Sequence, residues 1–177
     1  MSNFNRIDRQ LVYTGNVIDL YEDTIECPDG RCVKYDFIKH IGAAAVIPVL
    51  PNGNIIMVKQ HRNAIDRDTL EIPAGKLDAE NESTKDAAMR ELEEETGYKS
   101  SNLELLITLR TAVAFCNERI DVYVARDFEK KQQNLDDDEE IDVYEYSIDE
   151  LCEMIYTQKI EDAKTIAALM AYKNKYC

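Results

Sequence analysis

Apolar and polar residues alternate along the first third of the chain, and turn residues separate the alternating segments. A period of two is typical of a strand with one buried face. The pattern predicts strands at residues 10–14, 17–24, 31–39, 43–49 and 55–60. Pro28-Asp29-Gly30 predicts a turn before the third of these strands, and Pro51-Asn52-Gly53 predicts a hairpin between the last two. The first part of the chain is therefore expected to be mostly β-structure.

A helical period replaces this alternation in the middle of the chain. We expect a helix that is capped by Ser83 or by the Glu-Asn pair before it, runs to about Glu95 and stops at Gly97. Its apolar stripe consists of Ala88, Met89 and Leu92. Such a stripe would pack the helix onto a sheet.

Strands and then helices follow this central helix. Further strands are predicted at residues 103–110, 120–125 and 141–146, and helices at 148–157 and 161–174. The acidic run at 136–140 is expected to form a loop. Strands on both sides of one helix indicate an α/β fold with a mixed sheet covered on both faces. With 177 residues and no internal repeat or linker, the chain is expected to form one domain.

Charge and cysteine content limit the class of partner and the compartment. The chain has 21 Lys and Arg against 35 Asp and Glu, which gives a formal net charge of −14. A surface this negative repels a phosphate backbone, so no nucleic acid partner is expected. The five cysteines are scattered without zinc-site spacing, which indicates reduced thiols and a cytoplasmic protein. The longest apolar run, 41–50, is too short to span a membrane, and no membrane partner is expected.

Three glutamates gather near the end of the central helix. At about 100° per residue, Glu91, Glu94 and Glu95 form a wedge of roughly 100° beside the apolar stripe. Carboxylates in a last turn oppose the helix dipole, and Glu91 repels Glu95 four residues on. A hard divalent cation, Mg²⁺ or Mn²⁺, would remove this repulsion, because it prefers carboxylate ligands. A solvated acidic face with Arg90 as its counter-charge is the alternative at this point.

The same segment resembles the Nudix box, G-x5-E-x7-R-E-U-x-E-E-x-G-U, in which U is a bulky apolar residue. Glu82, seven further residues and then Arg90-Glu-Leu-Glu-Glu-Glu-Thr-Gly-Tyr98 fit this pattern. One departure is that six residues, and not five, separate Gly75 from Glu82. The segments 42–48, 59–62, 70–75 and 136–141 are similar to those of the ADP-ribose pyrophosphatase branch of this family, so the resemblance runs from about Leu11 to the C-terminus.

The resemblance implies a fold, an activity and a partner. The fold would be a Nudix α/β/α sandwich with a mixed β-sheet and an amino-terminal antiparallel strand extension. The whole chain, 1–177, would be one Nudix hydrolase domain, in which 1–40 contributes to a homodimer and 41–177 forms the catalytic core. The activity would be metal-dependent hydrolysis of the pyrophosphate bond of a nucleoside diphosphate sugar, with Mg²⁺ or Mn²⁺ as cofactor.

The resemblance also implies roles for individual residues. The metal ligands would be Ala74 through its carbonyl, Glu91, Glu94, Glu95 and Glu139. The catalytic residues would be Glu94, Glu139 and the orienting Arg90, with Asp137 or Glu140 as alternatives to Glu139. Arg62 and Glu71 would bind substrate, and Gly75 would let the backbone pass close to the metal.

The sequence leaves more than one substrate possible. ADP-ribose, hydrolysed to AMP and ribose 5-phosphate, is the first choice. Relatives with that preference often carry Ser-Pro-Gly-Phe where this chain has Ala112-Val-Ala-Phe115, so GDP-mannose, NADH or a diadenosine polyphosphate is the alternative. A non-catalytic nucleotide-sugar sensor is a third possibility, which the intact acidic motif disfavours.

Overall fold

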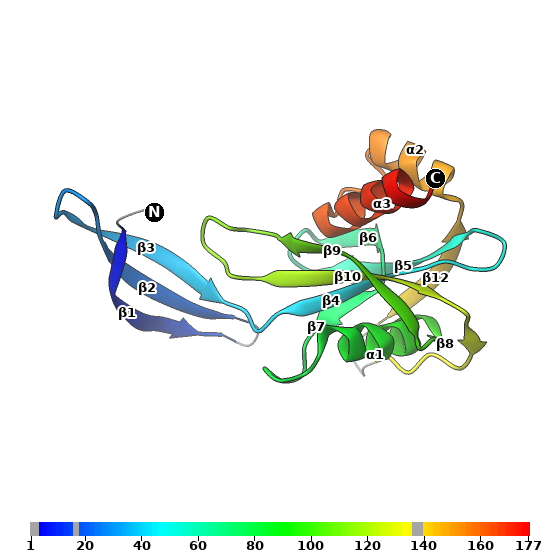
Figure 1. Cartoon of the computed structure of the whole chain (residues 1–177), viewed down its shortest axis with the longest axis horizontal. Coiled ribbons are helices and arrows are strands. Elements are labelled where there is room, and N and C mark those ends of the chain that lie inside the picture. Colours follow the sequence, from blue (N-terminus) through cyan, green and yellow to red (C-terminus); the bar gives the residue numbers. More distant parts are fainter. Residues whose placement is uncertain (1–3, 16–17, 136–139) are drawn as a thin grey trace. The chain divides into compact units, whose positions relative to one another are not determined.

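The computed structural model describes residues 4–15, 18–135 and 140–177, and Figure 1 shows its helices and strands. The chain divides into two compact units. The first comprises residues 1–41 and 110–119, and the second comprises residues 42–109 and 120–177. The segment 110–119 therefore groups with the amino-terminal strands, although it is distant from them in sequence.

The first unit is built on an antiparallel sheet of three strands. These strands are β1 (Asn5–Thr14), β2 (Asp19–Glu26) and β3 (Cys32–Lys39), paired in chain order. The strand predictions are confirmed, but β1 begins five residues before the predicted start at Gln10, because its polar beginning pairs with β2 up to Asn5–Glu26. Backbone hydrogen bonds to β2 determine where β1 begins. The alternation of apolar and polar residues gives little signal in that part of the sequence.

The segment 110–119 lies against β3 within the first unit. The Ile38 amide donates to the Phe115 carbonyl at 2.7 Å. The Asn117 side chain accepts from the His40 amide at 2.7 Å and donates to the His40 carbonyl at 3.0 Å. These contacts explain why the segment belongs to this unit.

The second unit contains the mixed sheet that the sequence predicts. Its strand order is β7-β4-β10-β9, formed by Ala74–Lys76, Ala43–Pro48, Arg119–Arg126 and Asn102–Arg110. The central strand β4 pairs parallel with β10 and antiparallel with β7. The short edge strand β7 was not predicted, since Pro73 and Gly75 disfavour a strand by local propensity.

A second sheet and a short strand pair complete the β-structure of this unit. Strands β12 (Ile141–Tyr146), β5 (Ile55–Arg62) and β6 (Arg67–Glu71) pair antiparallel in the order β12-β5-β6. Strands β8 (Tyr98–Lys99) and β11 (Glu129–Lys130) form the short pair. Like β7, the strands β6, β8 and β11 were not predicted.

The predicted hairpin between residues 43–49 and 55–60 is only partly present. Its turn forms, with hydrogen bonds from Gly53 to Leu50 and from Leu50 to Asn54. Beyond a single antiparallel bridge between Val49 and Ile55, however, β4 and β5 pair in different sheets, so the predicted hairpin is confined to its turn and this bridge. Strand β4 is buried throughout and β5 is buried in its first half, and a local turn signal cannot show which partners cover them.

The three predicted helices are present, and α3 begins and ends two residues later than the predicted 161–174. Helix α1 (Thr84–Thr96) is capped by Ser83, and its C-cap Gly97 has a φ of 68°. Helix α2 (Ile148–Tyr156) carries a capping box formed by Ser147 and Glu150. Helix α3 (Ala163–Tyr176) is capped by Asp162. Of the two caps considered for α1, Ser83 is therefore the one used.

The two faces of β4 bury two apolar clusters. Ala44 and Val46 pack with Ala88 and Leu92 of α1. The alternate residues face the cluster that holds α2 and α3; this second cluster includes Ala43, Ala45, Ile47, Leu151 and Leu169. Figure 1 shows α1 on one side of the mixed sheet and α2 with α3 on the other. The α/β/α sandwich is thus confirmed for this unit.

None of the helices formed by the described residues combines the length and hydropathy that a membrane-spanning helix needs.

Candidate active site

A cavity of about 250 Å³ opens where α1 faces β5 and β7 in the second unit. Its walls combine carboxylates of α1 with arginines and with the backbone of β7. The lining residues are Gln60, Arg62, Ala74, Gly75, Lys76, Asp78, Arg90, Glu91, Glu94, Glu95 and Asn134. The cavity therefore brings together every described residue that the sequence analysis assigned to metal, and also Arg90 and Arg62; Glu139 lies outside the described residues.

The glutamate wedge lies at the edge of the buried face of α1, as its helical spacing predicts. Glu95 is only 3% exposed, while the side chains of Glu91 and Glu94 are 12% and 34% exposed. Of the predicted stripe beside them, Ala88 and Leu92 are fully buried and Met89 is partly buried. Because the stripe anchors the helix on the sheet, the wedge is turned into the cavity and away from bulk solvent.

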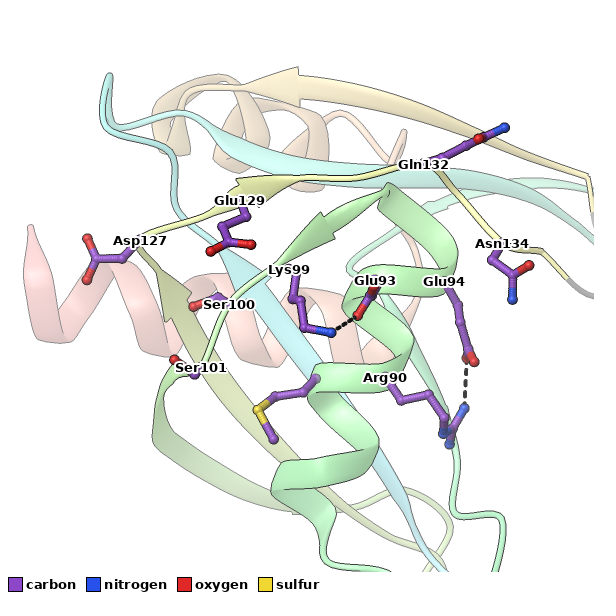
Figure 2. A pocket seen from close by; sticks show the side chains of 11 residues that line it. Arg90, Glu93, Glu94, Lys99, Ser100, Ser101, Asp127, Glu129, Gln132 and Asn134 are labelled. Carbon is purple, nitrogen blue, oxygen red and sulfur yellow. Dashed lines mark hydrogen bonds and ion pairs between the residues drawn. The ribbon is translucent and has the colours of Figure 1, made fainter.

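Arg90 holds the exposed part of this wedge. Its Nη1 atom lies 2.8 Å from Glu91 Oε1 and 3.0 Å from Glu94 Oε2. Burial alone would lower the pKa of Arg90, but Glu91, Glu94 and Glu82 outweigh burial and raise that pKa. Arg90 is therefore a fixed positive charge that lines up two carboxylates. Figure 2 shows its pair with Glu94.

Glu82 closes the loop that enters α1. Its carboxylate accepts from the Asp78 amide at 2.7 Å and lies 3.4 Å from Arg90 Nε. The additional residue between Gly75 and Glu82 thus leaves Glu82 within reach of Arg90. This contact fits a supporting role for Glu82 at the start of the helix.

Gly75 lets the β7 backbone approach the carboxylates closely. A Cβ atom at this position would lie 2.0 Å from Glu91 Oε1, far inside van der Waals contact. The neighbouring Ala74 amide donates to Glu95 Oε2 at 3.1 Å. The backbone of Ala74 and Gly75 and the carboxylates of Glu91 and Glu95 therefore enclose a narrow space lined by oxygen atoms, which we call the cradle.

The cradle offers oxygen donors for a divalent cation without forming a complete metal site among the described residues. Among the described residues, no group of three or more His, Cys, Asp or Glu side chains already has the geometry of a metal site, and Glu91 and Glu94 share Arg90. The donor chemistry nevertheless fits, because carboxylate oxygens are the ligands that hard divalent cations prefer. The space kept open by Gly75 fits as well.

The segment after β11 is fastened to the end of α1. The Lys131 amide donates to the Gly97 carbonyl at 2.6 Å, and the Gln133 side chain donates to the Glu95 carbonyl at 2.6 Å. These bonds satisfy carbonyls that a helix end leaves without partners. The acidic run follows directly, but Asp137 and Glu139 lie outside the described residues. Glu140 is exposed and precedes β12.

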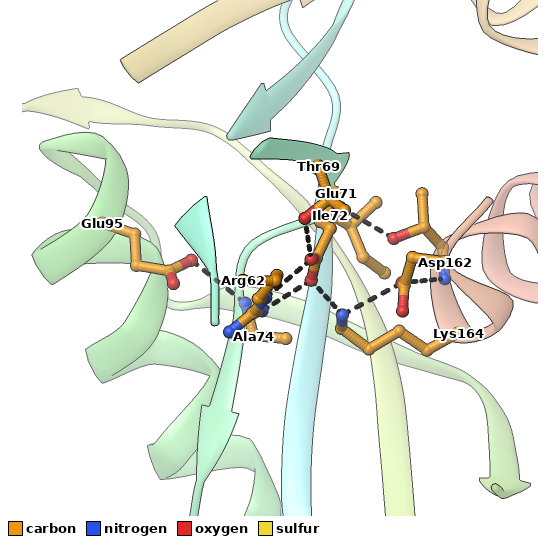
Figure 3. A network of polar contacts seen from close by, with 9 residues as sticks. Arg62, Thr69, Glu71, Ile72, Ala74, Glu95, Asp162 and Lys164 are labelled. Carbon is orange, nitrogen blue, oxygen red and sulfur yellow. Dashed lines mark hydrogen bonds and ion pairs between the residues drawn. The ribbon is translucent and has the colours of Figure 1, made fainter. Parts of the chain in front are cut away.

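Arg62 and Glu71 form a bidentate pair beside the cavity. Arg62 Nε lies 2.8 Å from Glu71 Oε1, and Nη2 lies 2.6 Å from Oε2. The Glu71 residue is 2% exposed and also accepts from Thr69 Oγ1 and Lys164 Nζ, as Figure 3 shows. Burial would raise the pKa of Glu71, but Arg62, Lys164 and Thr69 lower it to about 2. Arg62 therefore lines the cavity while an ionised Glu71 holds it from behind.

Sequence reasoning missed Lys164 and Thr69, which complete this network. It also missed Gln60 and Asn134, which line the cavity. Only Lys164 had a local signal, because a lysine in the first turn of a helix opposes the helix dipole. The other three are ordinary polar residues whose positions become informative only after folding.

A second and larger cavity, of about 670 Å³, lies on the outer side of α1. It shares Arg90, Glu94 and Asn134 with the first cavity. Lys99 and Glu93 form an ion pair at 2.6 Å on its wall, which Figure 2 also shows. Both acidic and basic side chains line this cavity, and no motif found in the sequence analysis predicts a site there.

An α/β/α sandwich in which an acidic helix end faces an arginine across a glycine offers the groups that hydrolysis of a phosphate anhydride uses: ligands for a cation and a donor for phosphate oxygens. Residues 39–169 match the model of the NUDIX domain. The chain therefore belongs to the NUDIX family and is a Nudix hydrolase. Enzymes of this family generally require divalent cations.

Several characterised proteins are similar to this chain over most of its length. The methanol dehydrogenase activator of Bacillus methanolicus is 39% identical over 165 residues, which cover 92% of this chain and 89% of that protein. The ADP-ribose pyrophosphatase of Bacillus subtilis strain 168 is 38% identical over the same length, with the same coverage of both chains. A crystal structure of ADP compounds hydrolase matches with a TM-score of 0.87 over 97% of this chain and 92% of that chain. Its identity of 18% shows a shared fold.

Proposed function

We propose that the protein hydrolyses the pyrophosphate bond of a nucleoside diphosphate sugar, with ADP-ribose as the first substrate to test. One observation carries the proposal: the carboxylate wedge of α1 and the Arg62 guanidinium line one cavity. Carboxylates supply ligands for a cation, and a guanidinium supplies a fork of donors for phosphate oxygens. A pyrophosphate needs both. The similarity to an ADP-ribose pyrophosphatase supports the choice of substrate.

The cofactor is proposed to be Mg²⁺ or Mn²⁺. Glu91, Glu94 and Glu95 would hold it with the Ala74 carbonyl, and Glu139 would add a ligand from the acidic loop. When bound, a hard divalent cation neutralises charge on phosphoryl oxygens and lowers the pKa of bound water. The Gly75 cradle and the hard oxygen donors support this assignment.

The remaining steps belong to the side chains of the protein. Arg62 would orient a phosphate, since Glu71 fixes the plane of its guanidinium from behind. Arg90 would keep Glu91 and Glu94 aligned. Glu139 is proposed as the base that takes a proton from the attacking water, with Asp137 or Glu140 as alternatives. Hydrolysis of ADP-ribose then consumes one water and yields AMP and ribose 5-phosphate.

A homodimer is proposed as the assembly. The outer strand β1 exposes several large apolar side chains. They are Ile7, Leu11, Val12 and Tyr13, each more than half exposed. An apolar edge strand of this kind needs a covering surface. Light scattering at micromolar concentration should give about twice the 20.3 kDa of one chain, and a mass near 20.3 kDa would reject the dimer.

The proposed function is tested by a hydrolysis screen with Mg²⁺ and with Mn²⁺. The compounds are ADP-ribose, GDP-mannose, NADH and a diadenosine polyphosphate, and the mononucleotide products are separated and quantified. ADP-ribose should be hydrolysed with the highest kcat/KM and should give AMP. Turnover of another compound while ADP-ribose stays intact would reject ADP-ribose but keep the class of reaction. No turnover of any compound would favour a nucleotide-sugar sensor.

A further inference from the structure

Lys164 occupies a position that folding stability alone does not explain. It stands in the first turn of α3, where a positive charge opposes the helix dipole. Its side chain is only 12% exposed, so it has lost most of its hydration. Its ammonium group contacts Glu71 and lies 3.0 Å from Asp162, the N-cap of the same helix. A buried lysine in this position indicates a role in the charge balance of the site.

The Glu71 carboxylate is shared evenly between two sides. On its cavity side, Arg62 donates to both carboxylate oxygens. On the other side, Thr69 donates to Oε1 and Lys164 to Oε2, so each oxygen has two donors. Figure 3 shows Arg62 and Lys164 approaching Glu71 from different directions. The carboxylate is therefore fixed in orientation, and with it the guanidinium plane of Arg62.

The charges of this network decide how strongly Arg62 attracts an anion. Glu71 alone would neutralise Arg62, because the two groups form a bidentate pair. Lys164 divides its charge between Glu71 and Asp162, so it offsets part of the Glu71 charge and leaves Arg62 more positive toward the cavity than Glu71 alone would. Among the described residues, the side-chain hydrogen bonds of Arg62 use only its Nε and Nη2 atoms. The Nη1 group can then serve a phosphate oxygen.

A hydrogen bond that does not involve Lys164 also joins the residue after β6 to the start of α3. The Ile72 amide donates to Thr165 Oγ1 at 3.1 Å, and Thr165 is fully buried. The first turn of α3 thus keeps its place beside Glu71 even when the Lys164 side chain is changed. A substitution at Lys164 can therefore test charge without removing the helix.

We propose that Lys164 is a positioning residue for substrate phosphate, acting through Glu71 to keep Arg62 oriented and electropositive. This inference rests on the proposed function, in which Arg62 contacts the diphosphate. Lys164 does not line the cavity of the carboxylate wedge; it lines a neighbouring cavity of about 440 Å³ with Arg62 and Glu71, and in the proposed role it does not contact the diphosphate. Its removal should weaken substrate binding and leave the chemical step nearly unchanged.

The test compares Lys164→Met with wild type in steady-state hydrolysis of ADP-ribose at saturating Mg²⁺. KM should rise about tenfold while kcat stays within about twofold. The reason is that the Arg62 contact binds the substrate and its transition state equally, so weakening it raises KM and leaves kcat unchanged. Lys164→Arg should restore KM to within about threefold of wild type, since the positive charge returns. The matched control is Lys173→Met on the same helix, which loses an ion pair with Asp149 at 2.9 Å and should leave both constants unchanged. Equal KM values for Lys164→Met and wild type would overturn the inference.

A second comparison separates the charge effect from damage to the fold. In a Glu71→Gln background, the carboxylate through which Lys164 would act on Arg62 has lost its charge, whereas the contact between Lys164 and Asp162 is kept. Adding Lys164→Met to Glu71→Gln should then change KM by less than about twofold. A tenfold rise in this background would show that Lys164 acts independently of Glu71 and would overturn the inference. This comparison of Glu71→Gln with the double variant can also be made if Lys164→Met alone is unfolded in thermal denaturation, because the double variant no longer has an ionised Glu71 buried without its lysine.

The wild-type assay distinguishes a failure of the proposed function from a failure of the role proposed for Lys164. If the wild type hydrolyses none of the screened compounds, the proposed function fails and the role of Lys164 fails with it. If the wild type hydrolyses ADP-ribose but Lys164→Met matches it, only the role of Lys164 is rejected.

Discussion

Gly75→Ala is the substitution whose effect follows most directly from the geometry. The added Cβ would lie 2.0 Å from Glu91 Oε1 and 2.3 Å from Glu91 Cδ. Since ordinary contacts of Cβ are at least about 3.4 Å, the carboxylate must withdraw by more than 1 Å, on the order of one bond length. The flexible end of a glutamate can make this movement at little cost. The same movement takes Glu91 out of the cradle.

The expected consequences for stability and for activity therefore differ. The lower conformational entropy of the unfolded chain stabilises an alanine variant by about 0.4–1 kcal/mol, which offsets a similar cost of crowding. We expect a free energy of unfolding within about 1 kcal/mol of wild type. Misplacing a cation ligand should lower kcat about a hundredfold, which corresponds to about 2.7 kcal/mol of transition-state stabilisation.

The assay combines initial rates of ADP-ribose hydrolysis with urea unfolding of the same preparations. Gly53→Ala is the control, because its Cβ would meet nothing within 4 Å but its φ of 86° strains an alanine. It should lose about 1 kcal/mol of stability and keep wild-type kcat. Adding Glu91→Asp to Gly75→Ala shortens the side chain by one bond and should recover part of the activity. Wild-type kcat in a folded Gly75→Ala would refute the assignment of Glu91 to the cradle.

Three further predictions test the carboxylates of the site. Glu94→Gln should abolish most hydrolysis yet leave the metal-free protein as stable as wild type or slightly more so, because it removes a charge that opposes the helix dipole; turnover at the wild-type rate would count against Glu94 as a ligand. Saturating Mg²⁺ or Mn²⁺ should raise the Tm of the wild type by calorimetry, since binding to the folded state alone stabilises it, and Glu94→Gln should show a smaller rise. The pKa of Glu71 is lowered from 4.5 to about 2, so its ionised form contributes stability above pH 4.5 that is lost as the pH falls through 2. The stability advantage of wild type over Glu71→Gln should therefore shrink by on the order of 3 kcal/mol between about pH 5 and pH 2, and a difference independent of pH would contradict the ionised, buried carboxylate.

Local sequence determined the helix that carries the acidic wedge. Ser83, Gly97 and the stripe of Ala88 and Leu92 act within a few residues, through capping and through burial of one face. The 3.6-residue period then places Glu91, Glu94 and Glu95 on one side, where the structure has them partly or fully buried. These features could be predicted because each depends on neighbours along the chain.

The tertiary structure decided which strands and helices contact one another. The strands on either side of Pro51-Asn52-Gly53 enter different sheets, because burial of both faces selects partners far along the chain and a turn does not. Strand β7 forms despite Pro73 and Gly75, since β4 offers it a backbone edge beside the carboxylates. Lys164 reaches Glu71 across 93 residues, and no period or propensity records a contact at that separation. The glutamates could thus be found from sequence alone, whereas the charge network that holds Arg62 exists only once the sheet and α3 have packed together.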